Sequence, residues 1–415
     1  MLKIRNAVLL FGSAVLLCGT LFCTVADRIG FDFPDWMSVN AKHSNLEGRN
    51  YTKFPKATVD TAMSGKFQSG FESYVSDLVP MRDKVLLTNA QLQRLSIVPM
   101  SMMVGYSDYP TFFGSGYYYD SAYNIVRAIP MKKENIKTDT VVKSIESINS
   151  FVETHPELNY LMYVPARAGV LELDAHSGLV SDAAGEDYVL DAISSKLDES
   201  VSLMHWSPSS DSEYAEKYYN SDHHWNIKAA YDAYCTTATF FGFGDELVQP
   251  VETVSFDDIS FYGSAARTGL DADYDADGVI DYRFNLPVYD VWVNGKKKDE
   301  GSVNSINRYE QGSWPQEDFS NYYGDYYHKD YSQIVFANQS EDAGDKSLLI
   351  VGDSYTNCIE RLYVSHYKKV YVYDPRLAKE TLSEFVEQCD DDIDDIMYMM
   401  CYMNLVDKRV TKNLR

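Results

Sequence analysis

Two short segments of this sequence carry residue types that could together perform acyl chemistry. The first, Gly352-Asp353-Ser354, follows an apolar stretch over 347–351 that is typical of a buried strand. A serine on a tight turn between a strand and a helix exposes its hydroxyl above the sheet and lies near backbone N–H groups. This position suits a nucleophile whose tetrahedral intermediate needs hydrogen-bond donors. The alternative is that Ser354 only caps a helix.

A serine nucleophile needs a base and a residue that orients the base. The second segment, Asp222-His223-His224-Trp225-Asn226, places two of the eight histidines beside a carboxylate, before a helix predicted over 226–241. On an extended turn Asp222 and His224 lie on one side, so Asp222 can hold one imidazole nitrogen while the other faces Ser354. N-capping by Asp222 and a metal site are the alternatives, but a metal would need further ligands and no companion motif is present.

The elements around these segments predict how they meet. Apolar strands are predicted at 158–164, 201–205, 347–351, 370–373 and 396–402, and helices at 141–153, 183–197, 226–241, 357–367 and 378–388. Continuous apolar strands that alternate with helices predict a parallel sheet covered on both faces, with ligands at the carboxyl ends of its strands. Ser354, Asp374-Pro375-Arg376 and Asn404 fall at those ends, and so does Arg167 after Pro165.

A second acidic cluster follows the beginning of a calcium-binding loop. Aspartates occupy positions 1, 3, 5 and 9 of that pattern: Asp273, Asp275, Asp277 and Asp281. Gly278 stands at position 6, where the turn needs it, but the expected glutamate at position 12 is Phe284. The pattern predicts a structural calcium ion, and an acidic loop without a metal is the alternative.

Composition limits the partners. Among 415 residues, 37 are Lys or Arg and 61 are Asp or Glu, which gives a formal charge of −24. Such a balance argues against nucleic-acid binding and against a basic patch for anionic lipid. It also disfavours a strongly anionic polymer as substrate, unless Arg376, Arg167 or Arg267 forms a local positive pocket.

Tyrosine is unusually frequent, with 33 residues. Tyrosine rings offer flat apolar area with one hydroxyl, which suits glycans and equally suits interface-rich surfaces. Three tyrosine-rich segments, 105–123, 214–219 and 322–331, could supply faces on which sugars stack.

The N-terminus has the features of an export segment. Ala7 to Val25 is an uncharged apolar run, preceded by Lys3 and Arg5. This pattern predicts a signal anchor over 1–26 that spans the cell membrane once and leaves the body outside. Cleavage near Ala26 would instead release a secreted protein.

The rest of the chain is predicted to form a stalk and one domain. Residues 27–60 are polar and irregular, which indicates a stalk or linker. Residues 61–415 are predicted to form an α/β domain with a β-rich insertion at about 245–335. Within it, apolar residues at helical spacing predict a helix pair over 64–95 that is interrupted at Pro80.

The two chemical segments together resemble a known family. Ser221-Asp222-His223-His224-Trp225-Asn226 is similar to the motif that names the DHHW family of bacterial surface proteins, and Leu348 to Asn357 resembles the second block of that family. His366-Tyr367 and Asp374-Pro375-Arg376 fit its spacing. Phe71 to Asp83 is similar to the N-terminal helix pair of a wider group, which includes the alginate O-acetylation proteins with their SGNH-hydrolase-like domains.

This resemblance implies an SGNH-hydrolase-like α/β domain with a central parallel sheet, in which Ser354 is the nucleophile, His224 the general base and Asp222 its orienting partner. The order Asp, His, Ser matches the acetylation group and differs from that of the better-known SGNH esterases, which a triad defined by geometry permits. The backbone N–H of Ser354 or Tyr355 is the expected oxyanion donor. Asn357 and Arg376 are further candidates for oxyanion or substrate contacts, although Arg376 could equally form a structural ion pair.

The expected function is that of a cell-surface SGNH-like O-acetyltransferase or acetylesterase that acts on a glycan. A single span cannot carry an acyl group across a membrane, so a transferase would need a multi-span partner that delivers it. The alternatives are an inactive surface protein of the same fold that binds a glycan or an assembly partner, and a calcium-dependent adhesin. Apart from the possible calcium ion, no cofactor is expected.

Overall fold

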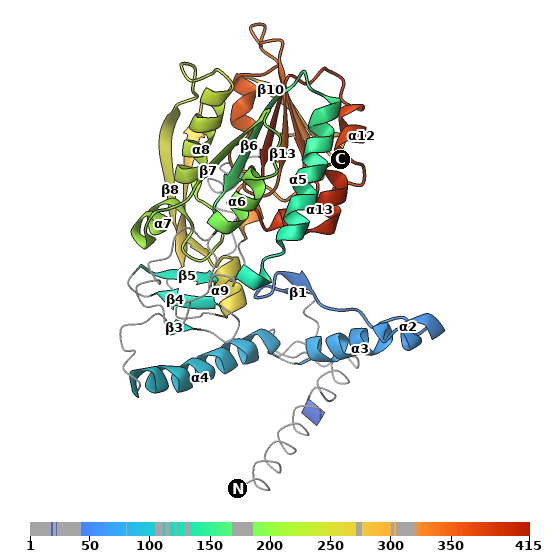
Figure 1. Ribbon diagram of the computed structural model, residues 1–415. Coiled ribbons are helices and arrows are strands. Elements are labelled where there is room, and N and C mark those ends of the chain that lie inside the picture. The colour runs from blue at the N-terminus through green and yellow to red at the C-terminus, as the bar shows by residue number, and fades with distance from the viewer. Residues whose placement is uncertain are drawn as a thin grey trace. The chain divides into compact units, whose positions relative to one another are not determined.

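The computed structural model describes residues 18–19, 22, 43–79, 81–103, 111–112, 117–120, 123–128, 133–167, 186–270, 276–299, 303, 319 and 322–415. The chain divides into two compact units (Figure 1). The first comprises Met1–Ser107 with Leu270–Asp273, and the second comprises Asp108–Gly269 with Tyr274–Arg415. Residues 61–107, which we expected in the α/β domain, therefore belong to the first unit.

Within residues 43–103, the described part of the first unit has a short hairpin and three helices. They are β1 (His43–Ser44), β2 (Arg49–Asn50), α2 (Val59–Met63), α3 (Lys66–Asp77) and α4 (Arg82–Met103). The predicted helix pair is confirmed, because α3 ends and α4 begins on either side of Pro80. No helix among the described residues combines the length and the apolarity needed to cross a bilayer, and nearly all of the predicted anchor lies outside those residues.

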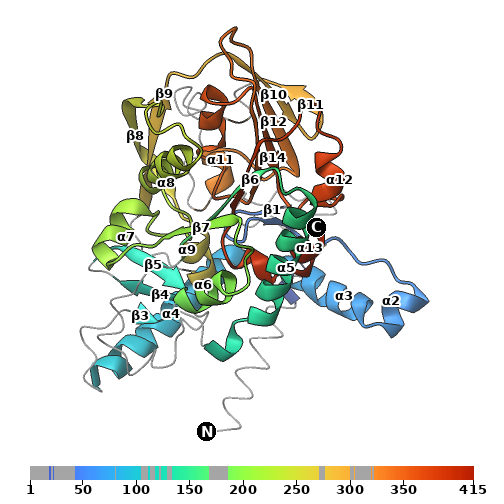
Figure 2. The same cartoon turned by 45° about the horizontal axis from the view of Figure 1, so that its top comes forward.

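An eight-stranded mixed sheet forms the centre of the second unit (Figures 1 and 2). Its strands, in spatial order, are β11 (Lys296–Lys298), β10 (Tyr289–Val293), β12 (Gln333–Asn338), β14 (Lys369–Tyr373), β13 (Ser347–Gly352), β15 (Asp395–Met399), β6 (Asn159–Pro165) and β7 (Val201–Trp206). The five strands from β14 to β7 are parallel, as predicted. The other three are antiparallel, so the part of the predicted β-rich insertion that holds β10 and β11 extends the central sheet.

Smaller elements surround this sheet. The strands β3 (Thr111–Phe112), β4 (Tyr117–Asp120) and β5 (Ile125–Ala128) form one sheet, and β8 (Pro250–Phe261) pairs with β9 (Asp277–Phe284). The helices are η2 (Lys133–Asn135), α5 (Thr138–Thr154), α6 (Asp187–Ser194), α7 (Asp211–Lys217), α8 (Ile227–Phe240), α9 (Ser264–Gly269), α11 (Tyr323–Tyr326), η5 (Glu360–Ser365), α12 (Leu382–Val386), η6 (Asn404–Val406) and α13 (Lys408–Asn413).

Alternation along the strands divides the core into two layers. In β13, Leu348 and Ile350 point to one face of the sheet, and Leu349 and Val351 point to the other. Helix α8 covers the first face, while α5 and α13 cover the second (Figures 1 and 2). Among the described cysteines none forms a disulfide, so burial of apolar area is the main stabilising term for this unit.

Two predicted helices that follow Ser354 are shorter than expected. After Ser354 the chain makes turns and then the 3-10 helix η5, because Asp353 accepts from the Tyr355 N–H, and the Thr356 hydroxyl donates to the Asp353 carbonyl. Such side-chain bonds compete with a regular helix. The predicted helix at 378–388 begins only at Leu382, since Thr381 and Glu384 form a capping box there.

The tyrosine-rich segments are largely core rather than surface. Most of their described tyrosines are buried: Tyr118, Tyr214, Tyr218, Tyr219, Tyr323, Tyr326 and Tyr327. Their rings pack against one another and against neighbouring aromatic rings in stacked and edge-on pairs. The expectation that these segments offer sugar-stacking faces is therefore wrong for these seven residues.

An ion pair between the partly exposed Arg49 and the buried Asp77 joins β2 to α3 in the first unit. Both outer nitrogens of Arg49 donate to the carboxylate of Asp77, at 2.9 and 2.7 Å, and the Thr52 N–H donates to the same group. The paired Arg49 is the main reason that the pKa of Asp77 lies well below its ordinary value.

We expect Asp77→Asn to weaken the first unit by about 2 kcal/mol at neutral pH, because the variant loses hydrogen bonds to a charged acceptor. The pKa of Asp77 falls on folding, so this stabilisation is full above its ordinary value of 3.8 and is lost as the pH falls further. Hydrogen exchange of the amides in β2 and α3, followed against pH, measures the difference. The exposed Asp60→Asn is the control, and a difference that does not change with pH would contradict the assignment.

Candidate active site

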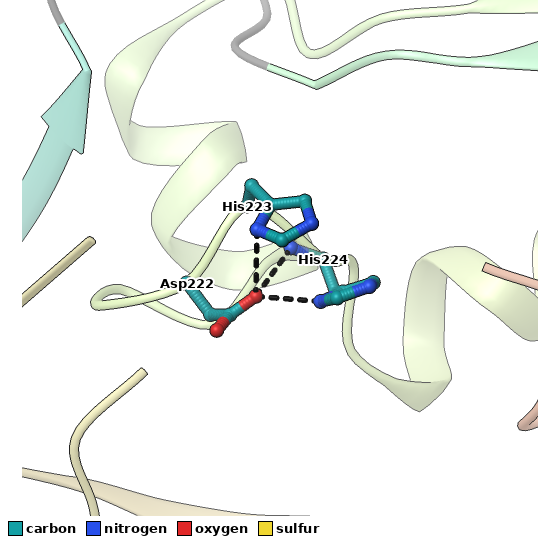
Figure 3. A group of neighbouring side chains, drawn as sticks. All are labelled: Asp222, His223 and His224. Atoms are coloured by element: carbon teal, nitrogen blue, oxygen red, sulfur yellow. Dashed lines mark hydrogen bonds and ion pairs between the residues drawn. The ribbon is translucent and has the colours of Figure 1, made fainter. Parts of the chain in front are cut away.

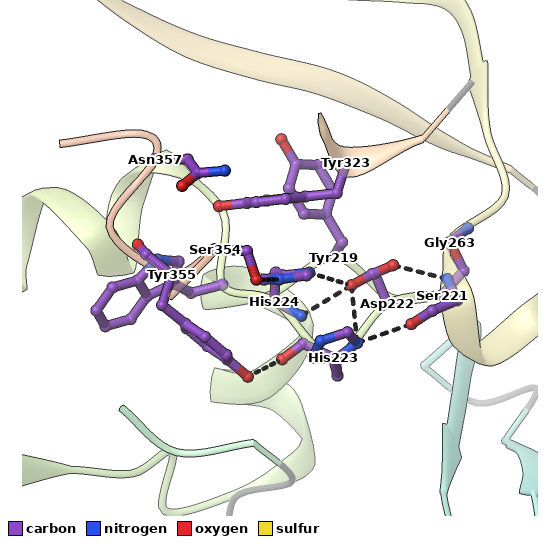
Figure 4. A network of polar contacts seen from close by, with 12 residues as sticks. Tyr219, Ser221, Asp222, His223, His224, Gly263, Tyr323, Ser354, Tyr355 and Asn357 are labelled. Atoms are coloured by element: carbon purple, nitrogen blue, oxygen red, sulfur yellow. Dashed lines mark hydrogen bonds and ion pairs between the residues drawn. The ribbon is translucent and has the colours of Figure 1, made fainter. Parts of the chain in front are cut away.

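The structure brings Ser354, His224 and Asp222 together in one chain of hydrogen bonds (Figure 4). His224 Nε2 lies 2.7 Å from Ser354 Oγ, and His224 Nδ1 lies 2.6 Å from Asp222 Oδ1. A carboxylate can only accept, so we assign the imidazole proton to Nδ1, which leaves Nε2 to accept the serine proton. This is the arrangement in which a serine hydroxyl can be activated by a histidine.

Asp222 is buried, and each of its oxygens accepts hydrogen bonds. Oδ1 accepts from the His224 N–H at 3.0 Å as well as from the imidazole, and Oδ2 accepts from the Ser264 N–H at 2.6 Å. Burial alone would raise the pKa of Asp222, but His223, His224 and the Ser264 N–H outweigh burial and hold it well below its ordinary value. Asp222 therefore stays ionised and can stabilise a positive charge on His224.

Gly263 allows this contact, because it lies directly against Asp222. A Cβ atom at position 263 would come within 2.5 Å of both Asp222 Cβ and the Ser221 carbonyl oxygen. The Gly263 N–H also donates to Ser221 Oγ at 2.9 Å. Sequence reasoning missed Gly263 and Ser264, whose only signal is a small-residue pair at the start of the short helix α9.

Aromatic side chains hold the imidazole of His224 in place. The Tyr323 ring of α11 stacks on it with the ring centres 3.8 Å apart and the planes 4° apart (Figure 4). Tyr219 packs edge-on against Tyr323. This stacking fixes the orientation in which Nε2 faces Ser354.

Trp225 and Tyr355 join the two chemical segments. The Trp225 indole N–H donates to the Tyr355 carbonyl at 3.0 Å, and the Tyr355 hydroxyl donates to the His223 carbonyl. Both side chains are almost completely buried. Tyr355, the residue after Ser354, therefore binds the histidine segment through its backbone carbonyl and its hydroxyl.

Asp353 ties the serine turn to the end of the neighbouring strand β15. Its Oδ2 accepts from the Cys401 N–H at 2.8 Å and from Asn404 Nδ2 at 2.6 Å, while Oδ1 accepts from the Tyr355 N–H at 3.0 Å. The Tyr355 N–H is thus occupied, and the expectation that it is an oxyanion donor is wrong. The Ser354 N–H donates to no other group among the residues that the structure describes, so it is available for that role.

Asn357 and Arg376 bind groups of the protein itself. Asn357 Nδ2 donates to the His328 carbonyl and to Asp330 at 3.1 and 3.2 Å. Arg376 forms a bidentate ion pair with Asp374 and donates a further hydrogen bond to Asp330 at 3.0 Å. The structural ion pair that was the alternative for Arg376 is therefore present.

A second histidine–carboxylate pair lies behind the serine turn. His328 Nε2 lies 2.9 Å from Glu360 Oε1, and both side chains are almost completely buried. Burial lowers the pKa of His328, but Glu360 outweighs this and raises it overall. Glu360 also accepts from the Thr356 hydroxyl at 3.1 Å. The pair braces the turn that carries Ser354, and no sequence motif indicates it.

Asp222, His223 and His224 form the group of potential metal ligands within the described part of the chain (Figure 3). The Asp222 Oδ1 atom lies 2.6 Å from His224 Nδ1 and 3.3 Å from His223 Nδ1. Two ligand atoms of a tetrahedral zinc ion lie about 3.3 Å apart, given bonds of about 2.0–2.1 Å. The shorter Asp222–His224 contact therefore fits a hydrogen bond better than a shared metal.

The aspartates of the calcium-loop pattern do not meet at one point where the structure describes them. Asp273 and Asp275 lie outside the described residues. Asp277 and Asp281 both lie in the extended strand β9, where residues four apart are about 13 Å apart. Asp277 accepts from the Ser221 hydroxyl at 3.1 Å, and burial raises the pKa of Asp281 to about 6.

The sequence and the fold were compared with those of known proteins. No family model matches the sequence, and a search of curated proteins gives no significant match. Among solved structures, the chain is similar to Bacillus cereus PatB1 with a sulfonyl adduct, at 15% identity over 71% of this chain and 96% of that chain, with a TM-score of 0.53. It is also similar to a DHHW family protein from Eubacterium siraeum, at 16% identity over 73% and 96%, with a TM-score of 0.53.

These two likenesses show the fold. The chain has the mixed α/β fold of the DHHW family protein, and the family resemblance that the sequence indicated is confirmed at that level. The O-acetyltransferase domain of Pseudomonas putida AlgJ is more distant, at 9% identity over 74% of this chain and 98% of that domain, with a TM-score of 0.34.

We expect Gly263→Ala to displace Asp222 and to destabilise the second unit by about 2 kcal/mol, because an added methyl group overpacks this contact. The proton on His224 Nδ1 reports the displacement, since its low-field NMR resonance depends on the bond to Asp222. Gly344→Ala is the control, because its new Cβ atom would meet its nearest neighbour, the His366 carbonyl, at an ordinary 3.6 Å. An unshifted resonance in Gly263→Ala would show that this glycine does not position Asp222.

Proposed function

We propose that this protein is a serine acyltransferase or esterase of the SGNH-hydrolase-like type. The observation that carries the proposal is the continuous hydrogen-bonded chain from Ser354 Oγ through His224 to the buried Asp222, at 2.7 and 2.6 Å. Its position supports the same conclusion, because ligands of parallel sheets bind at the carboxyl ends of the strands and Ser354 follows the end of β13. The likeness of the fold to PatB1, which has been solved with a sulfonyl adduct, is consistent with a reactive centre in such a fold.

The proposed reaction has two acyl transfers. Ser354 Oγ attacks the acyl carbonyl while His224 Nε2 takes the serine proton, and the ionised Asp222 stabilises the resulting imidazolium. The tetrahedral intermediate places its oxyanion near the Ser354 N–H, and its collapse gives an acyl-serine as His224 returns the proton to the leaving oxygen. An acceptor hydroxyl or water then attacks the acyl-serine by the same steps in reverse.

The substrate and the surroundings are proposed from the family resemblance. The acyl group is acetyl and the acceptor is a glycan, at the cell membrane, with residues 1–26 as the anchor and a multi-span partner that delivers the acyl group. The alternative, an inactive surface protein of the same fold that binds a glycan or an assembly partner, is favoured by one observation. The Tyr355 N–H is bound to Asp353, which leaves Ser354 as the one backbone donor that we assign to the oxyanion.

We expect Ser354→Ala to lower the hydrolysis of 4-nitrophenyl acetate at least a thousandfold, because a triad without its nucleophile keeps only binding and oxyanion contacts. Mass spectrometry of the wild-type protein, quenched during turnover, should find the acetyl group on the peptide that contains Ser354. The exposed Ser340→Ala is the matched control and should keep full activity. Unchanged turnover in Ser354→Ala would reject Ser354 as the nucleophile, and a wild-type protein that neither turns over nor is acetylated would favour the inactive alternative.

A further inference from the structure

Three arginines could give this acidic protein a local positive charge near Ser354, and the structure separates them. Arg376 is paired with Asp374 and Asp330. Arg267 donates to the Phe319 and Tyr262 carbonyls, both at 2.6 Å, and lies over the Tyr322 ring. The Arg167 guanidinium forms neither a hydrogen bond nor an ion pair with any residue that the structure describes.

Arg167 lies at the same edge of the sheet as Ser354. The register aligns Gly352 of β13 with Met399 of β15, and Met399 with Tyr163 of β6. Strands are about 4.8 Å apart, so the carboxyl ends of β13 and β6 are about 10 Å apart, a distance that an arginine side chain largely spans. Ser354 lies two residues after Gly352, and Arg167 lies four residues after Tyr163, the residue of β6 in register with Gly352.

The backbone at Arg167 is held from two sides. The Tyr218 hydroxyl donates to the Ala166 carbonyl at 2.6 Å, and the Arg167 N–H donates to Glu186 at 2.6 Å. Tyr218 belongs to the segment that leads into Asp222, so the start of the Arg167 side chain is fixed relative to the site. The backbone of Arg167 is thus fixed while its guanidinium has no partner among the described residues, an arrangement that suits a ligand rather than the fold.

Electrostatic effects place the charge of Arg167 beside the site. Burial is the main cause of the lowered pKa of His223, and the charges of His224, Arg167 and Arg376 lower it further. Tyr355, next to the serine, also lies within the electrostatic range of Arg167. Arg376 is paired with two carboxylates, whereas the Arg167 guanidinium is paired with no carboxylate among the described residues.

We propose that Arg167 binds an oxyanion group, a carboxylate or a phosphate, on the molecule that accepts the acyl group from Ser354. A guanidinium binds either group through two parallel hydrogen bonds, and a half-buried guanidinium without a counter-ion gains most from such a partner. The inference rests on the proposed acyl transfer and adds the substrate class, which is an acidic rather than a neutral glycan. It also explains how a protein of charge −24 can accept an anionic polymer, since the remaining surface repels it.

The test compares acceptors that differ in charge. Acetyl transfer from 4-nitrophenyl acetate is measured with a neutral cello-oligosaccharide, an oligogalacturonate and an oligomer of glycerol phosphate. We expect the wild-type protein to prefer the carboxylate or the phosphate acceptor, and Arg167→Gln to lower kcat/KM for that acceptor at least tenfold. Arg167→Lys should recover part of the loss, because it keeps the charge but not the paired donors. Hydrolysis of the neutral ester, which offers no oxyanion group to Arg167, should fall less in both variants than transfer to the anionic acceptor.

Arg409→Gln, which removes an exposed arginine of α13, is the matched control and should leave every rate unchanged. A wild-type protein that prefers the neutral acceptor would overturn the inference. So would an equal loss in Arg167→Gln with neutral and anionic acceptors. Either result overturns the inference only if the wild-type protein hydrolyses the neutral ester through Ser354. If the wild-type protein does not hydrolyse the ester, the proposed function itself has failed.

Discussion

The site depends on one buried charge, the carboxylate of Asp222. A buried carboxylate is costly unless several donors surround it, and here two backbone N–H groups and an imidazole supply them. One of these donors, Ser264, is distant in sequence and can approach only because Gly263 has no side chain. The hydrogen bond that Asp222 accepts from Ser264 therefore fixes the path of the chain just after β8. The bond between Asp222 and His224 fixes the imidazole.

A second constraint follows from the distance in sequence between His224 and Ser354. Two turns from separate parts of the chain must meet with a tolerance of a fraction of an ångström. Trp225 and Tyr355 hold the two turns at this distance by hydrogen bonds between them, while Asp353 fixes the serine turn to β15. The aromatic residue after the two histidines and the acidic residue before the serine are thus positioning residues. The proposed chemistry therefore needs two motifs and not only three isolated side chains.

The positions of the five parallel strands along the chain and the meeting of Asp222, His224 and Ser354 could be predicted from sequence, because apolar runs and their carboxyl ends are local patterns. The spatial order of the strands was not predicted. The role of the Tyr355 N–H could not, since it depends on the side chain of Asp353 turning back to accept it. The prediction of sugar-stacking tyrosines failed for a related reason. Composition gives the number of tyrosines but not whether each is buried, and most of those described in 214–219 and 322–331 lie in the core. Arg167 and Arg376 looked alike in sequence, and only their distant partners distinguish them.

The edge of the central sheet has a consequence for the protein outside its site. Strand β11 ends the sheet with three successive exposed lysines, Lys296, Lys297 and Lys298, on a body that is otherwise acidic. A strand edge with open N–H and C=O groups invites another chain to pair with it, but the burial of three adjacent ammonium groups would oppose such pairing. The lysines therefore disfavour the pairing of copies of the protein through the β11 edge of the sheet.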